Sequence, residues 1–217
     1  MVSLHPNPIF APHYVAQRLC VVTLSIILAV SPSCAQSNGK NYFPLADGAQ
    51  WTYSGSISSP DGKKPTMQVQ AKARVEGKTL INGKEYFKYV ITAEFPRLSK
   101  TPGLSEDVRY YRVERDGIHF LSGKNPDGPE RLEIPMPLRL DVKWLSGPNE
   151  AWAERAGTIR AGTREYANCI KITYKMAGGA RKTEYYLAPG VGVIRAVDVD
   201  NAEPKTVMEL TLENYQQ

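Results

Sequence analysis

Histidine and cysteine are both scarce in this sequence of 217 residues, which contains 3 of each. His5 and His13 precede the first long apolar run, so His119 is the only histidine in the rest of the chain. A histidine-rich metal site is therefore excluded. The sequence also lacks a GxSxG elbow, a P-loop and a glycine fingerprint between a strand and a helix. We predict no cofactor, no metal and no enzymatic activity.

An excess of one charge is also lacking. Lys and Arg number 27 against 22 Asp and Glu, which gives a scattered net charge of +5. This excess is too small to predict a nucleic-acid partner. Acidic residues such as Glu106, Asp107, Glu114 and Asp116 show no pairing typical of a glycosidase. The segment 198–201 offers oxygens to calcium, but acids alternating with Val beside a turn are more typical of exposed strand ends. We expect these carboxylates to be solvated.

The only long apolar run lies between residues 19 and 30, after Arg18. It is too short to span a bilayer and is typical of a signal peptide. Ser33 and Ala35 supply the small residues that precede a cleavage site. We therefore predict that residues 1–35 are a signal peptide and that residues 36–217 form the mature domain, with a net charge of +4.

Cys34 supports an alternative in which its thiol is lipidated and becomes the mature N-terminus. Both alternatives predict export to the periplasm or cell envelope, and only the lipid anchor at Cys34 would attach the protein to a membrane. Cys20 lies within the apolar run, so Cys169 is the only cysteine of the folded domain and an intramolecular disulfide is excluded. The alternating stretch around Cys169 predicts a small buried side chain.

Apolar and polar residues alternate along most of the predicted mature domain. The alternation over 67–76 and 87–95 predicts two strands, and Asn82-Gly83 between them predicts a type I′ hairpin turn. Further strands are expected at 51–57, 108–115, 118–121, 151–159, 170–176, 183–187, 191–199 and 206–215. Gly178-Gly179 and the type II turn at 188–191 reverse the chain between three of them. We predict an all-β fold, a single antiparallel β-sandwich or partly open barrel of roughly ten strands.

Three pairs of short motifs recur in the same order, which suggests two related β-meander halves, about 42–125 and 134–217. The pairs are Pro44-Leu45 to Trp51 with Pro137-Leu138 to Trp144, Glu85-Tyr86 with Glu165-Tyr166, and Tyr110-Tyr111 to Gly117 with Tyr185-Tyr186 to Gly192. The proline-rich stretch 134–137 is the expected seam, since proline cannot donate to a central ladder.

Two longer motifs carry a resemblance to a known family. They are YFPLADGAQWTY at 42–53, of the form FPLxxGxxWxY, and YYLAPGVGVI at 185–194, of the form YYxAPGVGxI. Together with the stretch 161–172, they resemble signatures of a family of uncharacterised bacterial exported proteins and lipoproteins. The resemblance implies an antiparallel β fold at the cell envelope. It implies no activity and no catalytic residues.

Aromatic residues at recurring places are the candidate functional feature. They are Trp51, Tyr53, Tyr110, Tyr111, Trp144, Trp152, Tyr185 and Tyr186. They either pack in the core and seam or edge an apolar groove that holds a lipid or other hydrophobic ligand. The favoured hypothesis is a non-enzymatic binding or structural module with an envelope protein as its partner. The alternative is a carrier of a hydrophobic ligand in a curved sheet, and a less favoured one is an envelope hydrolase that uses His119 or the acidic residues.

Overall fold

Twelve β-strands make up most of the described residues, which are 42–62, 65–95, 103–202 and 205–217 of a computed structural model. They are β1 (Gln50–Ser58), β2 (Met67–Ile81), β3 (Lys84–Phe95), β4 (Gly103–Val113), β5 (Gly117–Ser122), β6 (Arg131–Pro135), β7 (Lys143–Ser146), β8 (Asn149–Ala161), β9 (Arg164–Met176), β10 (Arg181–Ala188), β11 (Gly192–Asp200) and β12 (Thr206–Gln216). A short 3-10 helix, η2 (Ala177–Gly179), joins β9 to β10. The predicted signal peptide, with Cys34, lies outside the described residues.

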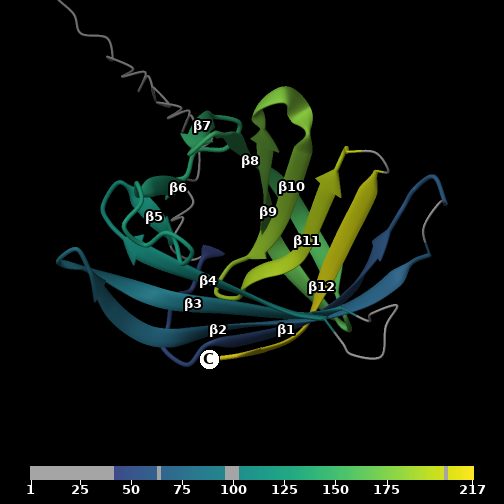
Figure 1. Cartoon of the computed structure of the whole chain (residues 1–217), viewed down its shortest axis with the longest axis horizontal. Helices are drawn as coiled ribbons and strands as arrows, with labels where there is room; N and C mark the ends of the chain where they lie inside the picture. The colour runs from purple at the N-terminus through teal and green to yellow at the C-terminus, as the bar shows by residue number, and fades with distance from the viewer. Residues whose placement is uncertain (1–41, 63–64, 96–102, 203–204) are drawn as a thin grey trace, which may run out of the picture. The chain divides into compact units, whose positions relative to one another are not determined.

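All twelve strands belong to one antiparallel sheet, and the predicted all-β class is confirmed. The strand order is β6-β5-β4-β3-β2-β1-β12-β11-β10-β9-β8-β7. The chain thus runs outward from β1 to β6 and returns from the opposite edge, at β7, to β12 beside β1. In Figure 1 the sheet curls, so that β5 and β6 lie across the interior from β9 and β10. The predicted half 42–125 contains β1 to β5, the predicted half 134–217 contains β7 to β12, and β6 lies across the expected seam. The duplication itself stays a prediction.

The two edge strands, β6 and β7, were not among the predicted strands. Both are short, and Pro135 ends β6, which is compatible with an edge position because proline has no N–H to donate. The predicted strand 108–115 is wrong at its end. Glu114 N donates to Gly117 O at 2.8 Å, so a tight turn replaces the last two residues before β5.

Two predicted turns are confirmed. Asn82 and Gly83 have φ angles of 49° and 75° and join β2 to antiparallel β3, as a type I′ turn requires. Gly190 has a φ of 73°, and Val191 N donates to Ala188 O at 3.2 Å, as in a type II turn. These turns set the register in which apolar residues of neighbouring strands face the same side.

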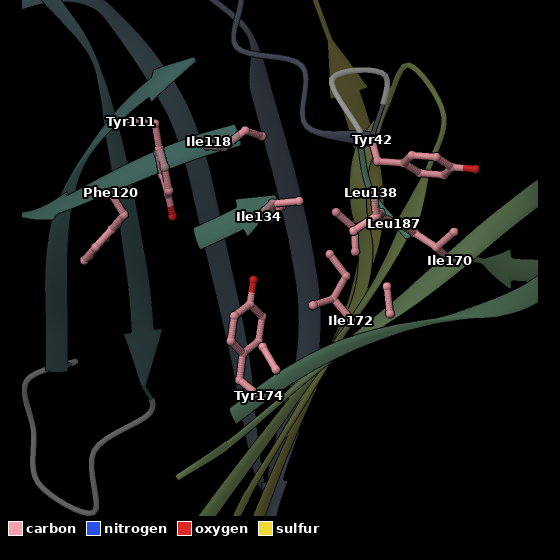
Figure 2. Packing of buried hydrophobic residues seen from close by; sticks show 12 residues of the cluster. Tyr42, Tyr111, Ile118, Phe120, Ile134, Leu138, Ile170, Ile172, Tyr174 and Leu187 are labelled. Carbon is pink, nitrogen blue, oxygen red and sulfur yellow. The ribbon is translucent and has the colours of Figure 1, made fainter. Parts of the chain in front are cut away.

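One end of the curled sheet is filled by residues 42–49 and 136–140. Tyr42 is buried and donates its hydroxyl to Asn168 O at 2.8 Å, while Gly48 N donates to Val75 O at 3.1 Å. Figure 2 shows Tyr42 beside Leu138, and both belong to a buried cluster with residues of β5, β9 and β10. This end of the interior is therefore closed by tightly packed side chains.

Candidate functional site

The curled sheet encloses a cavity of about 370 Å³ beyond this packed end. It exists because several inward positions carry small side chains. Ala71 pairs with Ala93 across β2 and β3, and Ala196 pairs with Leu210 across β11 and β12. All four line the cavity. Alanine at these positions leaves space that a leucine would fill.

The side of the cavity formed by β1, β2, β3 and β12 is apolar. Besides the alanines it presents Val69, Ile91, Met208 and Leu210. They occupy alternate positions on their strands, so the same period-two pattern that predicted the strands also creates this surface. We call it the apolar wall. It can accept an aliphatic group without leaving a polar atom unpaired.

The strands β4, β6, β10 and β11, of which β4 and β11 adjoin the apolar wall, carry three arginine–carboxylate pairs. Arg109 Nε donates to Asp107 Oδ2 at 2.7 Å, Arg131 Nε lies 3.4 Å from Glu133 Oε2, and Arg181 Nε donates to Asp198 Oδ1 at 2.9 Å. We call this the polar wall. The cavity thus has both hydrocarbon and charge in its lining, and the two meet where Asp107 pairs with Ile91 and Asp198 pairs with Met208.

The polar wall continues into a second, outer compartment of about 340 Å³. The charged residues that line the inner cavity are Asp107, Arg109, Glu133, Arg181 and Asp198. All of them except Asp198 also line the outer compartment. The two spaces are therefore adjacent parts of one site. A ligand long enough to occupy both would extend from Arg131, which lines only the outer compartment, to the apolar wall of the inner cavity.

Arg109 occupies the boundary between the two compartments because of its register on β4. It pairs with Tyr89 of β3, an inward residue, and its side chain stays 28% exposed. Burial lowers the pKa of Arg109, but Tyr111, Tyr185 and Asp107 raise it by more, so the net change is upward. The guanidinium is therefore a permanent positive charge inside the site.

Five tyrosines ring the middle of the cavity, namely Tyr53, Tyr89, Tyr111, Tyr174 and Tyr185. Burial is the main cause that raises the pKa of Tyr111 to about 12, and it also raises the pKa of Tyr53, Tyr89 and Tyr174. Those four phenols stay protonated at neutral pH. Tyr53 donates to Val193 O at 3.0 Å and Tyr174 to Glu133 O at 3.3 Å, which fixes two of the rings.

The eight aromatic residues singled out from the sequence fall into three groups. Tyr53, Tyr111 and Tyr185 line the cavity. Trp51 and Trp144 are packing residues, and their indole N–H groups donate to Val191 O at 2.6 Å and to Glu133 O at 3.0 Å. The remaining three lie away from the cavity.

Those three residues alternate with inward neighbours and so point the other way. Tyr110 precedes the cavity residue Tyr111 on β4. Lys143 Nζ lies 5.7 Å from the ring centre of Trp152, and Arg195 Cζ lies 5.2 Å from that of Tyr186. The rings of Trp152 and Tyr186 therefore carry cation–π contacts rather than a ligand surface.

Sequence reasoning missed the charged half of the site. Asp198 was expected on a solvated surface, and that expectation is wrong, because it is only 12% exposed and faces the cavity. Asp107 also lines the cavity, but its side chain is 41% exposed. Tyr89 and Tyr174 were not singled out either. The alternation along β4 could have revealed the two charged residues there. Arg109 and Asp107 are two and four positions before Tyr111, so their side chains must face inward as Tyr111 does.

His119, the candidate for a hydrolase, lies outside the cavity. Its Nε2 is 2.9 Å from Asp116 Oδ1, and its Nδ1 is 3.9 Å from Glu130 Oε2. It is absent from the lining of both compartments, so it cannot act on a ligand held there. Within the described ranges, no group of three or more His, Cys, Asp or Glu side chains could hold a metal ion.

Glu130, beside His119, is the centre of an ion network on the outer side of the sheet. Its carboxylate accepts from Tyr86 OH at 2.6 Å, from Arg112 Nη2 at 2.7 Å and from Lys84 Nζ at 3.2 Å. Burial alone would raise the pKa of Glu130, but these donors lower it to about 2. The network ties the segment before β6 to β3 and β4.

Cys169 is 2% exposed, as predicted, and packs with residues of the second buried cluster, such as Ala161. Burial raises the pKa of its thiol, which keeps it protonated and unreactive at neutral pH. Its Sγ lies 3.1 Å from Tyr166 O. In the described part of the chain, no helix has the length and hydrophobicity needed to cross a membrane.

No family model and no curated protein matches this chain. A crystal structure from Bacteroides fragilis, described as a "putative exported protein" with a YmcC-like fold, is 13% identical, covers 81% of this chain and 99% of its own, and has a TM-score of 0.43. A "putative lipoprotein" from Parabacteroides distasonis is 11% identical, covers 81% and 98%, and has a TM-score of 0.34. Neither likeness carries an argument about function, and the family resemblance stays a prediction.

Proposed function

We propose that this protein is an exported, non-enzymatic binding protein that holds a small amphiphile inside its curled sheet. The observation that carries the proposal is the cavity of about 370 Å³ whose lining combines an apolar wall with charged side chains. A cavity that served only as a packed core would be filled by large side chains. Instead Ala71, Ala93 and Ala196 keep it open, and the charged pairs give it a defined polar side.

The size of the cavity favours a ligand with one chain. Small-molecule sites span about 300 to 1,000 Å³, and this cavity is near the lower end of that range. A lipid with several acyl chains would need more room. Between the two non-enzymatic hypotheses from the sequence, the cavity favours the carrier of a hydrophobic ligand over a module that binds an envelope protein.

The cellular location of the protein is proposed from its sequence. The apolar run at 19–30 and the small residues before position 36 support export, and Cys34 supports a lipid anchor as the alternative. Mass spectrometry of the N-terminus after expression in a bacterium separates the two. Cleavage after Ala35 gives an unmodified chain that starts at Gln36, whereas lipidation gives a chain that starts at an acylated Cys34.

The binding role is tested by titration with a fluorescent fatty acid, 11-dansylaminoundecanoic acid. We expect saturable binding by the mature domain and at least about tenfold weaker binding by Ala196→Leu, which fills the cavity. Val197→Leu is the matched control, because its side chain is next in sequence and lies outside the cavity lining. Absence of binding by the wild-type domain, or equal binding by both variants and the wild type, would refute the proposal.

A further inference from the structure

Hydrogen-bond donors are in surplus on the polar wall. Arg109, Arg131 and Arg181 all line the outer compartment, and each guanidinium presents five N–H groups and no acceptor. Three carboxylates face them, one for each arginine. A ligand group placed among these side chains therefore meets N–H groups more often than free oxygens.

The carboxylates of the polar wall are already engaged by donors of the protein. Asp198 accepts from Arg181 through both oxygens and from Thr183 Oγ1 at 2.7 Å. Glu133 Oε2 accepts from Ser146 Oγ at 2.7 Å. These bonds occupy both oxygens of Asp198 and one oxygen of Glu133.

Arg131 is the least satisfied of the three arginines. Its Nε is buried without a hydrogen-bond partner in the described part of the chain, since Glu133 Oε2 is 3.4 Å away in poor geometry. Its guanidinium carbon lies 4.0 Å from the ring centre of Phe120. On another side the Gly147 turn is so close that an added Cβ would lie 3.2 Å from Arg131 Cδ. These neighbours restrict the stem of Arg131, while 34% of its side chain stays exposed.

Arg109 lies deeper, and lines both compartments. It gives its Nε hydrogen to Asp107, while 28% of its side chain remains accessible within the site. The two guanidinium groups border the same outer compartment from β4 and β6. An oxygen-rich group in that compartment would have donors on two sides.

We propose that the ligand is a single-chain amphiphile with an anionic head group, and that Arg131 and Arg109 bind this head. The inference rests on the proposed binding role and adds the chemical class of the ligand. The head occupies the outer compartment, and the tail lies along the apolar wall against Ala71, Ala73 and Leu210. Carboxylate and phosphate heads share the required chemistry, because both accept paired N–H bonds from arginine.

The test compares amphiphiles that share a twelve-carbon tail, by calorimetry below their critical micelle concentrations. They are dodecanoate, dodecyl phosphate, dodecanol and dodecyltrimethylammonium. We expect at least one of the two anions to bind about tenfold or more tightly than dodecanol, and the cation to bind more weakly still. Binding of dodecanol as tight as that of both anions would overturn the anionic head but keep the binding role. Absence of binding by all four would overturn both.

Variants at Arg131 then test the residue. Arg131→Gln should weaken anion binding about tenfold and leave dodecanol binding unchanged, whereas Arg131→Lys should retain a preference for the anion. A loss of affinity for dodecanol as large as that for dodecanoate would show a merely structural effect and overturn the assignment. The comparison of head groups on the wild-type protein needs no variant, so the inference stays testable if a variant fails to fold.

Discussion

Trp144 on β7 donates its indole N–H to the backbone oxygen of Glu133 on β6 at 3.0 Å. Ser146 donates to the Glu133 carboxylate, and Tyr174 OH to the same backbone oxygen. The strands β6 and β7 are the two edges of the sheet. Among the described strands, each of them pairs through its backbone with only one neighbour. Side chains, rather than a ladder of backbone bonds, therefore join the two edges and enclose the cavity.

Trp144→Phe is expected to weaken this junction. The ring is kept but the N–H is lost, and Glu133 O keeps only the longer bond from Tyr174. We expect a loss of about 1 to 2 kcal/mol in the free energy of unfolding, measured by urea denaturation. Trp152→Phe, a control on the adjacent strand β8, should change it by less than about 0.5 kcal/mol. Equal effects of the two changes would show that the indole bond is unimportant.

Glu130→Gln is expected to remove a pH-dependent part of the stability. The folded-state pKa of Glu130 is lowered to about 2 from its ordinary value of 4.5, so its contribution is present above pH 4.5 and is lost as the pH falls toward 2. At pH 7 the variant should be about 2 kcal/mol less stable than the wild type. The difference between them should shrink steadily in urea unfolding from pH 5 to pH 3.

The control for this measurement is Glu209→Gln. Glu209 is 45% exposed and pairs with Arg195 at 2.8 Å, a surface ion pair that should contribute less than about 1 kcal/mol. A pH-independent difference between Glu130→Gln and the wild type would contradict the lowered pKa of Glu130.

Gly55→Ala is expected to disturb the pairing of β1 with β12, where the two halves of the chain meet. A Cβ at this position would lie 1.8 Å from Glu209 O, a backbone atom that cannot move aside without shifting β12. We expect a loss of at least about 2 kcal/mol in the free energy of unfolding. Ser56→Ala on the same strand should cost less than about 0.5 kcal/mol. Tolerance of alanine at residue 55 would show that the strands are farther apart than described.

Cys169 is expected to react with Ellman's reagent only when the domain opens. The thiol is 2% exposed and burial raises its pKa, so both access and thiolate content are low in the folded state. In the domain of residues 36–217, the rate at pH 8 should be at least about 100-fold below that in guanidinium chloride. Thr158→Cys combined with Cys169→Ser puts a thiol at an exposed position and should react at once. Fast reaction of the native wild type would contradict the burial of Cys169.

The strands of this fold are largely predictable because their patterns are local. Alternation over 67–76 and the Asn82-Gly83 turn depend on neighbours in sequence, and both were confirmed. The short strands β6 and β7 were not predictable, because their position depends on contacts such as that of Trp144 with Glu133. Edge strands need no long hydrophobic pattern of their own.

The candidate site was only partly predictable for the same reason. Tyr53 and Tyr111 were singled out as aromatics, but single-sequence patterns did not bring Asp107 and Arg109 near Arg181, which lies far along the chain. Their convergence depends on how the whole sheet curls. From sequence alone, acidic residues on a strand are predicted to be solvated. Only the register of the folded sheet shows which of them lie on the concave side.

The most direct test of the binding role is photo-crosslinking with a twelve-carbon fatty acid that carries a diazirine near the end of its tail. Peptide mapping by mass spectrometry should locate the adduct on the apolar wall, at Ile91, Met208 or Leu210. Ala196→Leu should abolish the adduct, and Val197→Leu should not. Adducts confined to exposed apolar residues such as Leu80 and Leu145, at equal yield in both variants, would contradict a ligand inside the sheet.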